Sequence, residues 1–358
     1  MNRAGSETIL KLFITTGDRS GKVGDVQARL RLLGLDIDDE PGEFGPGTER
    51  AVRIFQQRRH IIVDGIVGPH TWQELVEAGW RLGDRPLYLT HAPMRGDDVA
   101  TLQARLNALG FDAGRADGIF GRDTDAAVRA FQREYGVSED GIFGSRSLAA
   151  LVGLRVDRPG TSAGLRDEIR RADRSGAGNA LVVVDPGHGG RDPGELGRNG
   201  LREADVCWDL AERIAHRLAR TGAHVRFSRT EAESPDVTER ARRANALDAE
   251  LFLSLHLNSN PRPRATGAST YYFGGSRAGE LLAESIQGRL VALGLGDCRA
   301  HARSYSILKE TRMPAVLVEP AFITSPDDES RLESADFRSA IADAVGAGVE
   351  LFYGTPPR

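Results

Sequence analysis

The chain has 358 residues, a length that predicts two or three domains, each large enough to bury a core of its own. Hydrophobic residues make up 40% of the chain and charged residues 27%, which excludes a disordered or collagen-like protein. The formal net charge of −4 gives no electrostatic reason to expect nucleic acid or an anionic membrane as the main partner. Two cysteines cannot form a disulfide framework, and no stretch is apolar enough to span a bilayer.

The first residues do not resemble a secretory signal. The apolar stretch nearest the start, residues 9–14, is interrupted by Lys11, whereas a signal needs about 7–15 uninterrupted apolar residues. We therefore expect the protein to stay in the cytoplasm. Action at the cell wall would then need signal-independent export or lysis.

The N-terminal half contains an internal repeat with an offset of 76 residues. Residues 24–75 align with residues 100–151 without gaps, and 21 of the 52 aligned positions are identical. Such agreement is far above chance, so we infer a duplicated module. Each copy predicts three short helices, because its apolar residues are spaced three and four apart.

Glycines and threonines predict where these helices begin and end. Gly34 and Gly110 follow the first helix of each copy, where a residue that adopts a positive φ is favoured. Thr48 and Thr124 are expected to cap the second helix at its N-terminus. The third helix is expected to end near Leu75 in the first copy and Leu151 in the second.

The repeated motifs resemble a known binding module. Phe-Gly-x-x-Thr, Ala-Val-x-x-Phe-Gln and Asp-Gly-Ile-x-Gly occur in this order in both copies and are similar to the three-helix peptidoglycan-binding module of bacterial wall hydrolases. The resemblance covers residues 18–79 and 94–153. It implies that the two modules bind the wall polymer.

The remainder of the chain predicts a different kind of domain. Residues 156–179 are rich in Gly, Pro and Ser around a short helix-like piece at 165–173, which indicates a linker. From residue 180 to 353, strands alternate with helices, a pattern typical of a three-layer α/β domain with a mainly parallel sheet. The expected strands are 181–184, 224–228, 251–255, 268–273 and 315–318, and the expected helices are about 203–220, 237–247, 278–293 and 334–353. The predicted fold is thus two small all-α modules followed by an α/β catalytic domain.

Polar residues follow three of the predicted strands. His188 follows the first strand, His256 the third and Glu319 the last, while Glu203 opens the first helix of this domain. The carboxyl ends of parallel strands lie at one edge of a sheet, where active sites of open α/β folds are found. Imidazole and carboxylate groups are typical zinc ligands, so we expect a zinc site with one position open to water.

Each of these residues also has an ordinary structural interpretation. Most histidines of a soluble protein lie on the surface or are hydrogen-bonded within the core. Five other histidines of this chain lie at positions where we expect a solvent-facing or helical side chain. His188, however, lies between glycines, and His256 and Glu319 end buried strands where an unpaired polar group is costly. Glu203 by itself could be explained as an acidic residue that is favourable at a helix N-terminus. Its assignment as a metal ligand therefore depends on its occurrence together with the other three residues.

The C-terminal motifs resemble the zinc-dependent N-acetylmuramoyl-L-alanine amidases. Asp-Pro-Gly-His-Gly-Gly at 185–190, Arg-Glu at 202–203, Ser-Leu-His-Leu-Asn at 254–258 and Met-Pro-Ala-Val-Leu-Val-Glu at 313–319 occur in the family's order. The resemblance covers about 180–353. It implies that His188, Glu203 and His256 hold Zn²⁺ and that Glu319 is the catalytic acid/base, with no organic cofactor and no nucleophilic side chain. Cys207 and Cys298 are expected to be a helix-packing and a loop residue.

Two other functions fit the same residues. The absence of an export signal would suit a cytoplasmic amidase-like regulator that senses peptidoglycan precursors and controls a synthetic enzyme or a kinase, although a regulator has no need of all four site residues. A phage-type lysin would also suit a chain without a signal. A simple binding module leaves the two histidines and two glutamates unexplained.

Overall fold

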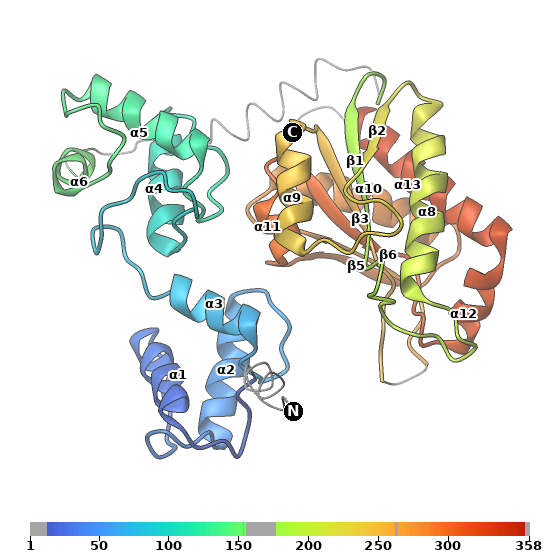
Figure 1. Ribbon diagram of the computed structural model, residues 1–358, viewed down its shortest axis with the longest axis horizontal. Coiled ribbons are helices and arrows are strands. Elements are labelled where there is room, and N and C mark those ends of the chain that lie inside the picture. Colours follow the sequence, from blue (N-terminus) through green and yellow to red (C-terminus); the bar gives the residue numbers. More distant parts are fainter. Residues whose placement is uncertain (1–12, 153, 155–176, 262–263, 355–358) are drawn as a thin grey trace, which may run out of the picture. The chain divides into compact units, whose positions relative to one another are not determined.

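The computed structural model describes residues 13–152, 154, 177–261 and 264–354 (Figure 1). The chain divides into two compact units, Met1–Ala163 and Gly164–Arg358, which are described separately. Most of the predicted linker, including the helix-like piece at 165–173, lies outside the described residues. No helix in the described part of the chain combines the length and apolarity needed to cross a membrane.

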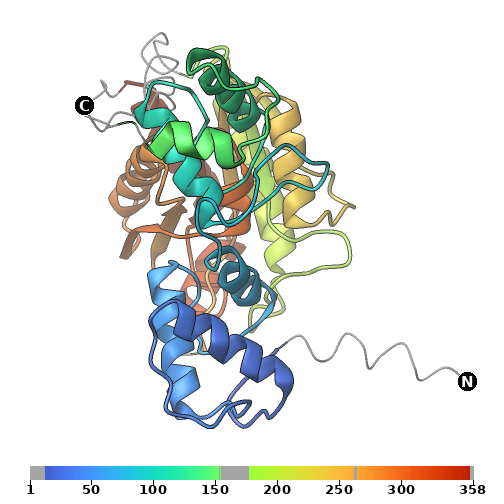
Figure 2. The same ribbon diagram turned by 90° about the vertical axis from the view of Figure 1, so that its left-hand side faces the viewer.

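The first unit contains the two helical repeats. Its helices are α1 (Gly21–Leu32), α2 (Pro46–Arg58), α3 (Pro69–Glu77), α4 (Asp97–Ala108), α5 (Arg122–Glu134) and α6 (Ser145–Val152). Each repeat buries its own core. Matching phenylalanines, Phe55 in the first repeat and Phe131 in the second, are almost completely buried among the predicted apolar faces. Figures 1 and 2 show the helices of both repeats.

The start of the second helix differs from the prediction. The caps are Gly45 and Gly121, and Thr48 lies within α2. Thr124 likewise lies within α5, and the first helical position is Pro46 in one repeat, where a fixed φ and a missing N–H are favourable, and Arg122 in the other. The buried Thr48 hydroxyl instead accepts a hydrogen bond of 3.1 Å from the Gln27 amide. The expected glycine ends are confirmed, with φ of +75° at Gly34 and +93° at Gly110.

The second unit is built on a six-stranded sheet. The strands are β1 (Leu181–Pro186), β2 (His224–Phe227), β3 (Leu251–Leu255), β4 (Ala268–Tyr272), β5 (Asp297–Ala302) and β6 (Ala315–Glu319), and their spatial order is β2-β1-β3-β6-β4-β5. Pairing is parallel except between β4 and β6. The predicted mainly parallel sheet is therefore confirmed.

Helices cover both faces of this sheet, as expected for three layers (Figure 1). The helices in the described part of this unit are α8 (Glu203–Ala219), α9 (Val237–Ala246), α10 (Arg277–Ala292), α11 (Ser306–Glu310), α12 (Pro326–Glu333) and α13 (Ala335–Gly354). Side chains of α8, α10 and α13 pack on one face of the sheet. Those of α9 and α11 pack on the other face, over β1, β3 and β6. Successive valines of β1 pack on opposite faces of the sheet: Val182 lies in the core under α8, α10 and α13, and Val183 lies in the core under α9 and α11. This alternation follows from the geometry of a strand, in which neighbouring side chains point to opposite faces.

The register brings three strand ends to one edge. Pro186 of β1 pairs with Leu255 of β3, and Leu255 pairs with Val318 of β6. Because β4 runs antiparallel to β6, its beginning lies at this same edge, where Ser269 pairs with Glu319. Residues that end β1, β3 and β6 therefore meet the start of β4.

Three elements of this unit are absent from the prediction. Strand β5 and helices α11 and α12 were not expected, because they are short and their sequences carry many polar residues. One cysteine is also corrected, since Cys298 lies in β5 and not in a loop. Cys207 is buried on α8, as expected for a packing residue.

Candidate metal centre and active site

His188 lies in a tight turn directly after β1. Its backbone has a φ of +56°, a conformation that non-glycine residues rarely adopt. The neighbouring glycine is required by space, because a Cβ at Gly187 would lie 2.5 Å from the His256 ring and 2.7 Å from the Leu255 carbonyl oxygen. The turn thus brings the Gly187 backbone against the end of β3, where its N–H donates to the Leu255 carbonyl at 2.8 Å.

Two buried arginines hold this turn by its carbonyl oxygens. Arg229 donates hydrogen bonds to the carbonyls of Pro186 and Gly187 at 2.8 and 3.0 Å. Arg240 donates to the carbonyls of Pro186 and His188. Burial and the nearby charge of Arg240 lower the pKa of Arg229. We call these two residues the arginine clamp; together they fix three consecutive carbonyls that end at His188.

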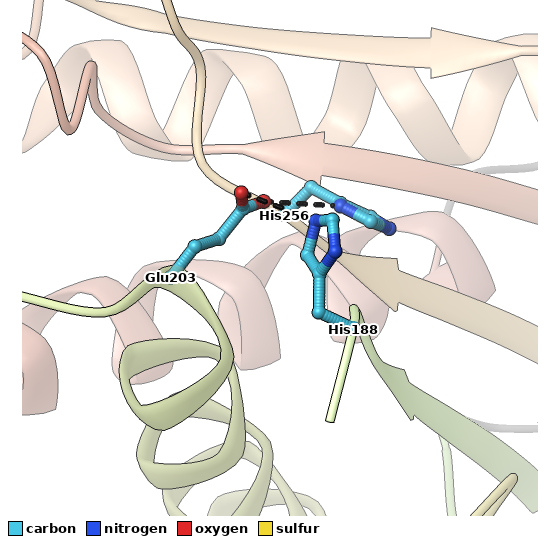
Figure 3. Close-up of side chains that lie close together, drawn as sticks. All are labelled: His188, Glu203 and His256. Atoms are coloured by element: carbon cyan, nitrogen blue, oxygen red, sulfur yellow. Dashed lines mark hydrogen bonds and ion pairs between the residues drawn. The ribbon is translucent and has the colours of Figure 1, made fainter. Parts of the chain in front are cut away.

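Glu203 is the first residue of α8 and points toward both histidines (Figure 3). Its side chain is only 3% exposed. One carboxylate oxygen accepts a hydrogen bond from the backbone N–H of Glu195, and the other accepts one from Leu257, each at 2.9 Å. Burial acts to raise the pKa of Glu203, but hydrogen bonds from His188 and His256 outweigh it and hold that pKa well below the usual value.

The three predicted ligand residues converge on one point. His188 Nε2 lies 3.1 Å from Glu203 Oε2, and His256 Nδ1 lies 3.1 Å from Glu203 Oε1. The ring centroids of the two histidines are 4.9 Å apart. Each of the three residues offers one ligand atom, and these atoms all lie within 4.8 Å of one another, so the group could hold a metal ion.

Asp192 orients His188 from the other side and was missed by the sequence reasoning. Its carboxylate lies 2.8 Å from His188 Nδ1, which leaves Nε2 directed at Glu203. A histidine that binds a metal through one ring nitrogen usually donates its other N–H to a carboxylate or a carbonyl. The sequence signal that could have identified Asp192 is its position, four residues after the candidate ligand His188.

Glu319 ends β6 beside this cluster. Its carboxylate lies 3.3 Å from the hydroxyl of Ser269, which in turn accepts a hydrogen bond of 2.8 Å from the Asn258 amide. Burial raises the pKa of Glu319 above its usual value, although nearby His256 acts in the opposite direction. A glutamate with a raised pKa is suited to accept and return a proton near neutral pH. Ser269 carried no sequence signal, because only the antiparallel pairing places it opposite Glu319.

The cysteine nearest this site offers no nucleophile. Burial raises the pKa of the Cys207 thiol well above its usual value, so the reactive thiolate form is disfavoured.

Two family models match the chain. The model described as N-acetylmuramoyl-L-alanine amidase matches residues 182–351, and the model of a peptidoglycan binding domain matches residues 19–75 and 95–151. A protein named N-acetylmuramoyl-L-alanine amidase CwlM, from Mycobacterium tuberculosis, is 41% identical over 359 residues, which cover 94% of this chain and 88% of that protein. The chain belongs to the N-acetylmuramoyl-L-alanine amidase family.

Other amidases match about half of the chain. N-acetylmuramoyl-L-alanine amidase LytC from Bacillus subtilis is 38% identical over 175 residues, which cover 48% of this chain and 35% of that protein. The solved structure of an N-acetylmuramoyl-L-alanine amidase from Clostridium difficile 630 is 28% identical, with a TM-score of 0.48, and covers 50% of this chain and 99% of that one.

Proposed function

We propose that this chain is a zinc-dependent hydrolase that cleaves the amide bond between N-acetylmuramic acid and the L-alanine of the stem peptide. The observation that carries this proposal is the convergence of His188, Glu203 and His256 beside a half-buried Glu319. Membership of the amidase family supports the bond that is cleaved.

The three clustered side chains suit zinc as their metal. Ligand atoms that lie about 2.0–2.1 Å from a tetrahedral zinc are separated from one another by roughly 3.3 Å. Each histidine lies 3.1 Å from a different oxygen of Glu203, and one ligand atom from each of the three residues lies within 4.8 Å of the others, a cluster of the size that one zinc ion needs. Two imidazoles and one carboxylate also leave the fourth position for water or substrate, as in catalytic zinc sites.

The reaction would divide between the metal and Glu319. Zinc, when bound, supplies a Lewis acid that polarises the scissile carbonyl and makes water a better nucleophile. Glu319 takes the proton of the attacking water as the tetrahedral centre forms, and then delivers it to the departing amine of L-alanine. Ser269 orients the Glu319 carboxylate for both proton transfers.

The two helical modules would hold the enzyme on its substrate. We assign residues 18–79 and 94–153 to peptidoglycan-binding modules, 156–179 to the linker and 180–353 to the amidase domain. The match of residues 19–75 and 95–151 to the peptidoglycan-binding model supports the first two assignments. In the described parts of these modules no group of three or more histidine, cysteine, aspartate or glutamate residues is spaced for a metal.

The test of the amidase assignment is a chemical one. The full chain, supplied with zinc, is incubated with purified muropeptides, and mass spectrometry follows the release of the intact stem peptide with a free L-alanine amine. Cleavage at any other bond, or no cleavage with one equivalent of zinc bound, would contradict the proposal.

The role of the modules is tested with residues 1–155. We expect this fragment to co-sediment with insoluble peptidoglycan and to release no peptide. A fragment that is folded by circular dichroism yet stays in the supernatant would overturn the binding assignment.

A further inference from the structure

A strip of partly exposed side chains extends from Glu319 along β4 and β5, on the face of the sheet that α9 and α11 cover elsewhere. We call it the Tyr271 strip; its members are Tyr271, His301, Arg303 and Tyr305. The Tyr271 ring lies 5.7 Å from the His301 ring and 5.4 Å from the Tyr305 ring, measured between centroids. The Arg303 guanidinium carbon lies 6.0 Å from the centroid of Tyr271.

Short contacts connect this strip to the proposed acid/base. The Tyr271 hydroxyl lies 3.1 Å from the Ser269 hydroxyl, which lies 3.3 Å from the Glu319 carboxylate. The charge of Glu319 also reaches the strip, because it adds to burial in raising the pKa of Tyr271 and of Tyr305. A series of contacts therefore leads from Glu319 through Ser269 and Tyr271 to Arg303.

Arg303 keeps its positive charge unneutralised. Among the described residues, no carboxylate forms an ion pair with its guanidinium, which donates a hydrogen bond of 3.1 Å to the Ala302 carbonyl and lies close enough to Tyr305 to act on the pKa of that hydroxyl in the lowering direction. By contrast, the buried Arg240 has Asp185 at 2.9 Å. A guanidinium has five N–H donors in a planar fork that matches a carboxylate, so Arg303 retains donors for an anionic ligand.

The substrate carries carboxylates on only one side of the scissile bond. In a muramoyl peptide the lactyl carboxyl group is consumed in the amide, and the amino sugars are uncharged. The stem peptide keeps the free carboxylate of its second residue, when this residue is not amidated, and the carboxylate at its C-terminus. A cation beside the site therefore distinguishes the peptide side from the sugar side.

We propose that Arg303, stacked beside Tyr271, binds a carboxylate of the stem peptide and directs that peptide along β4 and β5. This inference depends on the proposed amidase function and adds the orientation of the substrate to it. It also makes Arg303 a specificity determinant that favours acidic stem peptides over amidated ones.

The test pairs one variant with three substrates. The probes are a synthetic muramoyl tripeptide of L-alanine, γ-linked D-glutamate and L-lysine, the same compound amidated at the second residue, and the same compound amidated at the C-terminus. We expect Arg303→Met to raise KM for the acidic parent by about 10–100-fold, the range of one charge-assisted hydrogen bond, with a smaller change in kcat. Arg303→Lys should recover part of this loss.

The pattern across substrates separates recognition from structure. Wild type should lose the same 10–100-fold when the recognised carboxylate is amidated, and Arg303→Met should lose nothing further, because the two changes remove the same contact. The amidated probe that shows this non-additivity identifies which carboxylate is bound. Arg289→Met, an exposed arginine on α10 over the opposite face, is the matched control and should behave as wild type.

Equilibrium binding makes the test independent of turnover. Titration of the parent tripeptide into Glu319→Gln and into the double variant Glu319→Gln/Arg303→Met measures affinity for the uncleaved compound, and we expect the double variant to bind 10–100-fold more weakly. If wild type cleaves all three probes equally and Arg303→Met changes none of them, the inference is overturned while the amidase function stands. If wild type cleaves no muramoyl peptide, the proposed function fails instead.

Discussion

The guanidinium of Arg240 lies 2.9 Å from the carboxylate of Asp185, and the two side chains are 7% and 2% exposed. Asp185 also accepts hydrogen bonds from the hydroxyls of Ser228 and Ser254, so the end of β1 is tied to β3 and to the residue after β2. The same guanidinium holds the His188 carbonyl. A buried ion pair thus positions a candidate metal ligand through the backbone.

This relationship predicts that the arginine clamp sets metal affinity. Arg240→Lys keeps the charge but cannot reach Asp185 and two carbonyls at once, because lysine lacks the planar fork. We expect zinc affinity to fall by about 10–100-fold, the range seen when residues that orient metal ligands are changed. Competition with a chromogenic chelator measures it. The control is Arg242→Lys, an exposed arginine of the same helix, and a folded Arg240→Lys protein with unchanged affinity would refute the prediction.

A second prediction separates the ligand residues from the acid/base. His188→Ala should lose zinc and activity together, because only two protein ligands remain. Glu319→Gln should keep one zinc per chain and the fold, since Glu319 is assigned as a proton carrier, while turnover falls by at least about 10²–10⁴-fold. Metal analysis and muropeptide assays of both variants decide between these roles. Wild-type activity in either variant would remove that residue from the mechanism.

The raised pKa of Glu319 predicts the acid side of the pH profile. The carboxyl must be ionised to accept a proton, so activity is lost as the pH falls through its pKa, which burial raises above the ordinary 4.5. Ser269→Ala removes a hydrogen bond that favours the ionised form, and this side of the kcat/KM profile should therefore move to higher pH. Ser285→Ala on α10 is the control. A shift of the Ser269→Ala profile to lower pH would contradict the assignment.

A fourth prediction concerns the stability of the second module. The buried Gln132 amide donates to Asp140, Ile142 and Ser147 and accepts from the Gly141 N–H. Gln132→Met keeps the volume but leaves two buried partners, the Ser147 hydroxyl and the Gly141 N–H, without the Gln132 amide, at about 1–3 kcal/mol each. We expect the free energy of unfolding of residues 1–155 to fall by about 2–4 kcal/mol in urea titrations. Gln57→Met, at an exposed position, should change it little.

Much of the architecture could be predicted from sequence because the spacing of apolar residues along the chain indicates which side chains are buried. The unbroken apolar run of β1, the three- and four-residue spacings of the repeats and the glycines after their first helices all follow from local rules. Local rules failed at Thr48 and Thr124, which lie inside the helices that Gly45 and Gly121 cap. Strand β5 was missed because it lies at the edge of the sheet and contains mostly polar residues. None of its side chains is fully buried, so the sequence shows no clear alternation of apolar and polar residues.

The sequence by itself determined which residues could carry the chemistry: His188, Glu203, His256 and Glu319 stand at strand ends or a helix start, and parallel strands gather such positions at one edge. Only the tertiary structure decided which residues surround them. Ser269 faces Glu319, and Arg303 reaches Tyr271, because β4 runs antiparallel to β6 and β5 is added beyond it. Strand order and register depend on long-range packing of both sheet faces, and no spacing within a short segment encodes them.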